Sequence, residues 1–223
     1  MSAPAETPTP PALLLTGFEP FGGEADNPSW RLAQALHGET IAGLRVQAVQ
    51  LPCVFAQAGA ALQTALQQHR PRLVLATGQA QGRCDLSFER VAINLVDARM
   101  ADNAGAQPVD DPVTVGGAAA YFSSLPVNAM VAAARAAGVP ASLSHSAGTF
   151  VCNQVFYLLM QALQAWPGVR GGFMHVPLLP EQAARHPGVA SLPLDTLVAG
   201  TRAALAAALQ HTQDLRLPGG TVA

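Results

Sequence analysis

Short apolar segments that end in glycine alternate along this chain with longer segments of helical character. Residues 12–16 precede Gly17, and residues 72–77 precede Gly78, as expected of strands buried on both faces of a sheet. Between them, Asn27 can cap a helix whose first position is Pro28. This βαβ spacing predicts an α/β fold: a three-layer α/β/α sandwich with a mostly parallel, twisted sheet.

The same alternation continues to the end of the chain. Further strands are predicted at 44–51, 139–148 and 171–177, and further helices at 54–69, 126–138, 152–166 and 193–210. Residues 86–100 mix strand-like alternation with charges, and residues 101–117 form a long polar loop, a kind of segment that is often functional.

The length of 223 residues suits one substantial domain, although two small ones are compatible with it. No linker or internal repeat divides the chain, so we expect a single α/β domain over residues 12–223. Residues 1–11 are rich in proline and read as a disordered lead, not a signal peptide, because no basic segment precedes an apolar core.

Charge and composition exclude several function classes. The net charge is −2, and no basic face indicates nucleic-acid binding. All 12 cationic residues are arginines, so the chain has no lysine for a P-loop or for Schiff-base chemistry. No apolar run reaches the ~20 residues that span a bilayer. The spacing of histidine, cysteine and acidic residues fits no metal site, and we expect no cofactor. The three cysteines make no disulfide framework, which favours a cytoplasmic protein.

Cys152 is the main candidate for chemistry. It lies at a predicted strand-to-helix junction, where free N–H groups and the helix dipole stabilise an anion. A thiol placed there can have its pKa lowered toward neutrality and act as a nucleophile. The alternative is an inert core cysteine, which position alone favours by about two to one.

A thiolate nucleophile needs a histidine beside it and a third group to orient that histidine. His145 and His175 both lie near predicted strand ends, and spacing alone leaves them even. For the orienting carboxylate, Glu89 is embedded in an apolar stretch, with Asp97 and Asp102 as competitors. The plain alternative for Glu89 is a structural ion pair with Arg90 or Arg99.

Five segments together carry a family resemblance. "LLLTGFEPFGGEADNPSW", "ATGQAQGR", "FERVAINLVDARMADNAGAQP", "SAGTFVCNQVFYLLM" and "GFMHVPLLPEQ" occur in this order from Leu13 toward the last helix. In this the chain resembles the pyroglutamyl-peptidase I family, cytosolic cysteine peptidases that remove an N-terminal 5-oxoproline. The resemblance implies an oligomer, a homodimer or homotetramer, acting on peptides with N-terminal pyroglutamate.

The resemblance also implies roles for individual residues. By motif match, the catalytic cysteine, histidine and glutamate are Cys152, His175 and Glu89. The implied substrate-binding residues are Phe18, Phe21, Asn27, Gln79, Arg99, Phe150 and Val151. The family commonly has asparagine and threonine where His145 and Ser146 stand, which places a second histidine near the nucleophile.

Two rival readings follow from the same residues. An amidotransferase-type glutaminase would also use cysteine, histidine and glutamate, but its cysteine belongs in a sharp G-x-C-x-G turn, and Cys152 lacks the flanking glycines. The non-enzymatic rival is a redox-sensing or structural α/β protein in which Cys152 is merely reactive or buried.

Overall fold

A seven-stranded sheet forms the centre of the molecule, as a computed structural model describing residues 12–220 shows. Its strand order is β2-β3-β1-β4-β9-β5-β8. The strands of this sheet are β1 (Ala12–Phe18), β2 (Thr40–Ile41), β3 (Leu44–Leu51), β4 (Leu73–Gln79), β5 (Leu86–Glu89), β8 (Ala141–Ser144) and β9 (Arg170–Val176). A separate antiparallel pair joins β6 (Val91–Ile93) to β7 (Ala120–Phe122).

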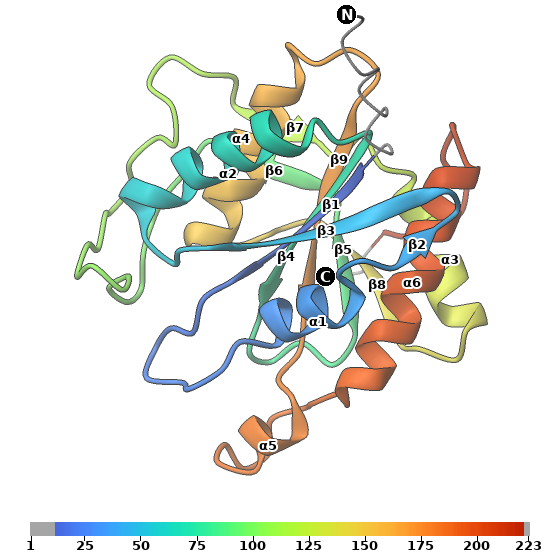
Figure 1. Ribbon diagram of the computed structural model, residues 1–223. Coiled ribbons are helices and arrows are strands. Elements are labelled where there is room, and N and C mark those ends of the chain that lie inside the picture. Colours follow the sequence, from blue (N-terminus) through green and yellow to red (C-terminus); the bar gives the residue numbers. More distant parts are fainter. Residues whose placement is uncertain (1–11, 221–223) are drawn as a thin grey trace, which may run out of the picture.

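Helices cover both faces of this sheet (Figure 1). On one face lie α2 (Phe55–His69) and α4 (Val151–Leu163), and on the other lie α1 (Pro28–Leu36), α3 (Val127–Ala136) and α6 (Leu194–Gln210). The short α5 (Pro180–Ala183) stands apart from both layers, beyond the end of β9. The predicted α/β class and the three-layer arrangement are therefore confirmed.

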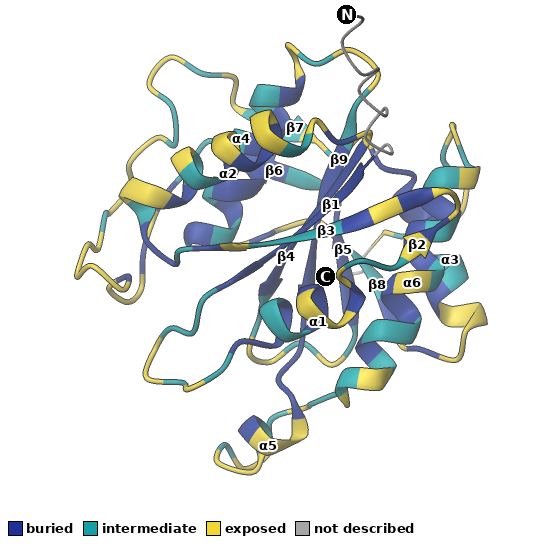
Figure 2. Ribbon diagram, in the orientation of Figure 1, coloured by how far each residue is buried: buried dark blue, intermediate teal, exposed yellow. Residues whose placement is uncertain are grey.

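Burial explains why the central strands read as continuous apolar runs. All seven residues of β1 are buried, because helices pack on both faces of the sheet. Figure 2 shows the central strands in the colour of buried residues and the outer loops mostly exposed. Along β9 the side chains alternate: Phe173 packs with α2 and α4, and Met174 and Val176 pack with α1, α3 and α6.

Local signals define several element boundaries. The Asn27 side chain accepts a hydrogen bond from the Ser29 N–H at 3.0 Å, and Pro28 is the first residue of α1, as predicted. At the end of α3, Gly138 has a φ of +78°, a conformation that glycine adopts without strain.

The sheet is mixed, and its direction changes at β9. Here β9 pairs parallel with β4 but antiparallel with β5, and β8 follows the direction of β5. The sequence pattern did not predict this reversal, nor the short elements β2, β7 and α5. Residues 101–117 contain no helix or strand, as expected of the long loop.

The expected proline-rich lead, residues 1–11, lies outside the described residues. Of the helices between residues 12 and 220, none combines the length and the apolar character needed to cross a membrane.

Candidate active site

The nucleophile candidate, Cys152, is the second residue of α4. The residue before the helix is Phe150, and no side chain caps this helix start within the described part of the chain. The first N–H groups of a helix have no partner inside the helix. They are therefore available to an anion that forms beside Cys152.

The sulfur of Cys152 lies over β4. A Cβ atom added to Gly78 would lie 2.6 Å from Sγ of Cys152 and 3.0 Å from the Phe173 ring. In the parallel pairing of β4 with β9, Gly78 is the register partner of His175. Paired residues in register point to the same face of a sheet. The thiol and the imidazole therefore meet on the face that α4 covers.

Glu89 joins this pair from the antiparallel strand β5. Oε1 of Glu89 lies 2.8 Å from Nδ1 of His175, and the two side chains are 0% and 5% exposed. A carboxylate only accepts hydrogen bonds, so Nδ1 carries the proton and Nε2 is left with a free lone pair. The imidazole ring also packs on Phe173, with ring centroids 4.9 Å apart. Its orientation is thus held by one hydrogen bond and one ring contact.

A cation that sequence analysis did not single out reaches the same carboxylate. Nη2 of Arg83 lies 3.4 Å from Oε1 of Glu89, 3.1 Å from the Ser144 hydroxyl and 3.1 Å from the Ser146 carbonyl oxygen. Arg90, one of the two partners that the structural alternative proposed, instead pairs with Asp214 at 3.3 Å. Glu89 therefore faces a histidine and a different arginine. Among the described residues, its second oxygen, Oε2, is buried without a hydrogen-bond partner.

The pKa of the Cys152 thiol is shifted upward in this environment. Burial raises the pKa of Cys152, and the neighbouring Cys53 sulfur and the Glu89 carboxylate raise it further. This corrects the expectation of a lowered pKa, because loss of solvation outweighs the favourable helix start. Cys53 is buried, whereas Cys152 is half-buried, and burial raises the pKa of the Cys53 thiol to about 12. The chemistry at Cys152 therefore calls for a base that removes the proton.

The competing candidates lie elsewhere. His145 is exposed on the loop after β8. Asp102 accepts hydrogen bonds from the backbone N–H groups of Phe55, Ala104 and Ala106, which hold the start of α2 against the long loop. Asp97 is exposed at the rim of a pocket. In the described part of the chain, none of these three side chains forms a hydrogen bond with the His175 imidazole.

A pocket of about 320 Å³ opens next to the start of α4. Four of the residues expected to bind substrate line it: Phe21, Gln79, Arg99 and Phe150. The rings of Phe21 and Phe150 lie 6.1 Å apart, and Phe150 also meets Phe55 edge to face at 5.2 Å. The pocket thus has an aromatic wall, with amide and charged groups around it.

The other three expected substrate-binding residues are buried outside the pocket lining. Phe18 is 2% exposed and packs in the core beneath α2 and α4. Asn27 caps α1, and its Nδ2 donates to the Glu19 carbonyl oxygen at 3.0 Å. Val151 is 0% exposed at the base of α4. Phe18 and Val151 belong to the core cluster against which the pocket residues Phe21 and Phe150 pack.

Two residues of this site carried little signal in the sequence. Gly78 ends a predicted strand, and only the fold shows that a thiol fills the space above it. Arg83 belongs to the segment "ATGQAQGR" but lies in the loop after β4, and its partner Glu89 is six residues further on, in β5. Within residues 12–220, no group of three histidine, cysteine or acidic side chains is placed to hold a metal ion.

Comparison with known proteins gives a consistent result over nearly the whole chain. The family model described as pyroglutamyl peptidase, Peptidase_C15, matches residues 12–211. The pyrrolidone-carboxylate peptidase of Cupriavidus taiwanensis is 58% identical, covering 94% of this chain and 98% of that protein. The pyrrolidone-carboxylate peptidase of Klebsiella pneumoniae is 55% identical, over 93% of this chain and 97% of that protein.

Solved structures agree with this assignment. The crystal structure of Bacillus amyloliquefaciens pyroglutamyl peptidase I superimposes with a TM-score of 0.89 at 42% identity, covering 92% of this chain and 100% of that one. The pyrrolidone carboxyl peptidase of Thermococcus litoralis gives a TM-score of 0.89 at 31% identity, over 93% and 99% of the two chains. Sequence and fold thus lead to one conclusion: this chain belongs to the pyroglutamyl peptidase family of cysteine peptidases.

Proposed function

We propose that this chain removes an N-terminal pyroglutamyl residue from peptides through a thioester on Cys152. The observation that carries the proposal is the convergence of three side chains on one face of the sheet. The Cys152 sulfur lies over the register partner of His175, and His175 is hydrogen-bonded to the buried Glu89 at 2.8 Å. This is the arrangement of nucleophile, base and orienting acid that acyl transfer uses.

The first step is proton transfer within the site. Nδ1 of His175 is engaged by Glu89, so Nε2 takes the proton from the Cys152 thiol. Because burial raises the pKa of that thiol, the sulfur gives up its proton as it attacks the substrate carbonyl, without first standing as a free thiolate. Glu89 stabilises the imidazolium that results.

Attack forms a bond between Sγ and the carbonyl carbon, and the carbonyl oxygen takes up the negative charge. N–H groups at the uncapped start of α4, including that of Cys152, stabilise this oxyanion. The C–N bond then breaks, and the imidazolium gives its proton to the departing amine. Water, deprotonated by His175, cleaves the thioester and regenerates the thiol.

The pocket accounts for the choice of acyl group. A 5-oxoprolyl ring has apolar edges and one lactam group, and the pocket has aromatic walls in Phe21 and Phe150 beside the amide of Gln79. Proline lacks the lactam carbonyl and carries a charged amine. It would leave polar pocket groups unpaired and bury its own charge. Roles for Phe18, Asn27 and Val151 are proposed as support for this wall, and Arg99 as a charge at the rim.

The test compares release of a fluorescent amine from pyroglutamyl and prolyl conjugates. We expect turnover of the pyroglutamyl conjugate and a kcat/KM lower by several orders of magnitude for the prolyl one. Cys152→Ala should abolish turnover, while Cys84→Ala, which changes an exposed cysteine, should retain it. Comparable rates on the two conjugates would contradict the pocket assignment. A homodimer or homotetramer and a cytoplasmic location remain predictions of the family resemblance.

A further inference from the structure

Gln182 is a buried amide that contacts two residues of the pocket lining, Glu24 and Gln79, and that the proposed reaction does not use. It lies in α5, beyond the end of the strand that carries His175, and is 1% exposed. It is the last residue of the segment "GFMHVPLLPEQ", which also contains His175. A fully buried amide is stabilised only when its polar atoms find partners, so each of its contacts constrains its orientation.

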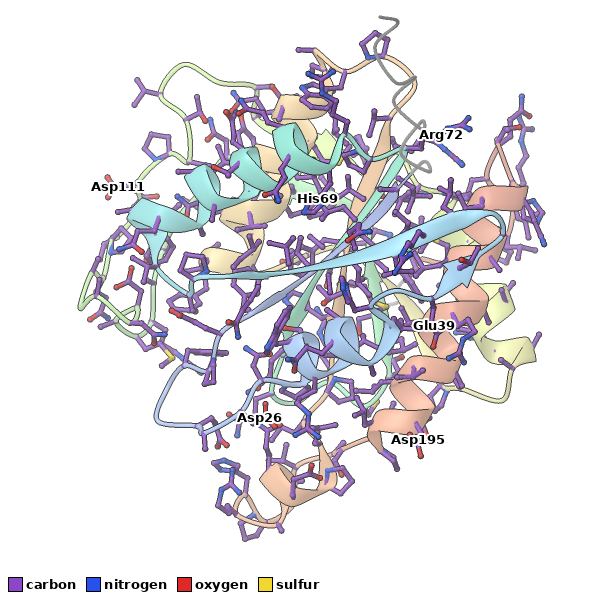
Figure 3. The ribbon with its side chains drawn as sticks, viewed as in Figure 1. Asp26, Glu39, His69, Arg72, Asp111 and Asp195 are labelled. Carbon is purple, nitrogen blue, oxygen red and sulfur yellow. The ribbon has the colours of Figure 1, made fainter. Side chains whose placement is uncertain are left out.

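The orientation of the Gln182 amide follows from its backbone partner. The Leu179 N–H can only donate, and it lies 3.1 Å from Oε1 of Gln182. The Gln182 Nε2 group therefore points the other way. It faces three acceptors, each at 3.3 Å: a carboxylate oxygen of Glu24, the backbone carbonyl oxygen of Asp26 and Oε1 of Gln79. Figure 3 labels Asp26, on the loop before α1 and close to α5.

The orientation of Gln182 determines that of Gln79, which is the last residue of β4 and lines the pocket. Because Gln182 offers a donor, the Gln79 amide presents its oxygen to Gln182. The Nε2 group of Gln79 is then left over as a donor, because within residues 12–220 it donates a hydrogen bond to no other group. The chain from Leu179 through Gln182 to Gln79 thus leaves an N–H donor for an occupant of the pocket.

We infer that Gln182 is a positioning residue that selects for a lactam carbonyl by fixing which end of the Gln79 amide faces the pocket. The inference rests on the proposed pyroglutamyl substrate, and it adds the group that donates a hydrogen bond to the ring oxygen of that substrate. With Gln182 in place, Gln79 donates to that oxygen. Without it, the amide is free to rotate and to present its own oxygen, which repels the lactam carbonyl.

Two substitutions test this relay in the full-length protein. Gln182→Met removes the donor, and Gln182→Glu keeps the shape and the acceptor for the Leu179 N–H but cannot donate to Gln79. We expect either variant to raise KM for a pyroglutamyl amide roughly tenfold, with kcat within about threefold of wild type. The inhibition constant of 2-pyrrolidone, the bare lactam, should rise in parallel. Glu181→Gln, at the exposed neighbouring position, is the matched control and should change neither value.

A double-mutant cycle with Gln79→Met separates positioning from simple support of α5. If Gln182 acts through Gln79, the double variant should have the KM of Gln79→Met alone, within about twofold. The inference would be overturned if the factors by which the two single substitutions raise KM multiplied in the double variant. It would also be overturned if both Gln182 variants kept the KM and the inhibition constant of wild type. Melting temperatures identify any variant that has lost its fold. If wild type does not cleave the pyroglutamyl amide at all, the proposed function fails and not the relay alone.

Discussion

The sulfur of Cys152 occupies the space that a side chain at Gly78 would fill: a Cβ atom added to that glycine would lie 2.6 Å from Sγ. The glycine therefore decides how closely the start of α4 approaches β4. Through the register of β4 with β9, it also decides how closely the thiol approaches His175.

Gly78→Ala should impair catalysis more than it impairs folding. The added methyl displaces the sulfur, and a misplacement of about 1 Å at a reacting atom costs on the order of 100-fold. We expect kcat/KM to fall at least about that far, with a loss of about 1–3 kcal/mol in the free energy of unfolding from overpacking. Gly171→Ala is the control, because its Cβ would lie 2.6 Å from Leu163 Cδ1, at the far end of α4. Near-normal kcat/KM in Gly78→Ala would contradict the placement of the thiol.

His175→Ala and His145→Ala should behave differently. His175 is 4% exposed and bonded to Glu89, while His145 lies on the exposed loop seven residues before Cys152. Loss of a general base costs about 10²–10⁴ in rate, so we expect that loss in kcat/KM for His175→Ala and a change within about threefold for His145→Ala. Equal damage from the two substitutions would rule out His175 as the sole base.

Glu89→Gln keeps the shape of the side chain but removes its charge. The amide can turn an N–H toward Nδ1 of His175, which moves the ring proton to Nε2 and takes away the base that Cys152 needs. We expect kcat to fall by about 10²–10⁴ at unchanged fold. Glu39→Gln makes the same chemical change at the exposed pair with Arg202, on the other face of the sheet, where Figure 3 labels Glu39. It should leave kcat unaltered, and a mild effect in Glu89→Gln would remove the carboxylate from the mechanism.

Alkylation by iodoacetamide should report the protonation state of Cys152. Because burial raises the pKa of this thiol above its ordinary value, the thiolate fraction at pH 7 is small and grows as pH rises. We expect labelling of Cys152, followed by mass spectrometry, to accelerate with pH through 9 without a plateau near neutrality. The exposed Cys84 serves as the internal reference and should react faster at pH 7. A plateau at pH 6–7 would instead show a preformed thiolate–imidazolium pair.

Local chemistry predicted much of the fold. Asn27 and Pro28 define the start of α1, and the alternation of residues 44–51 coincides with β3. The direction of β5 and β8 was not predictable in this way, because a four-residue segment such as Leu86–Glu89 does not by itself determine which strand it pairs with. Strand direction depends on long-range pairing, which a single sequence does not display.

The candidate site was recognisable only in part. The motifs supply Cys152, His175 and Glu89, and the structure places them on one face. Phe18 lies in a strand buried on both faces, so its sequence pattern could not tell the core from the pocket. The raised pKa of Cys152 was missed because desolvation depends on what packs around the sulfur, not on its position in the helix.

The place of β9 in the sheet has a consequence for assembly of the enzyme. It is the last strand in the chain, yet it lies between β4 and β5, so every ladder of backbone hydrogen bonds joining the two parts of the sheet runs through it. Before residues 170–176 take this place, no imidazole lies between the Cys152 thiol and the Glu89 carboxylate. A molecule in which β9 has not joined the sheet therefore has a thiol without a base beside it, and we expect it to leave peptides uncleaved.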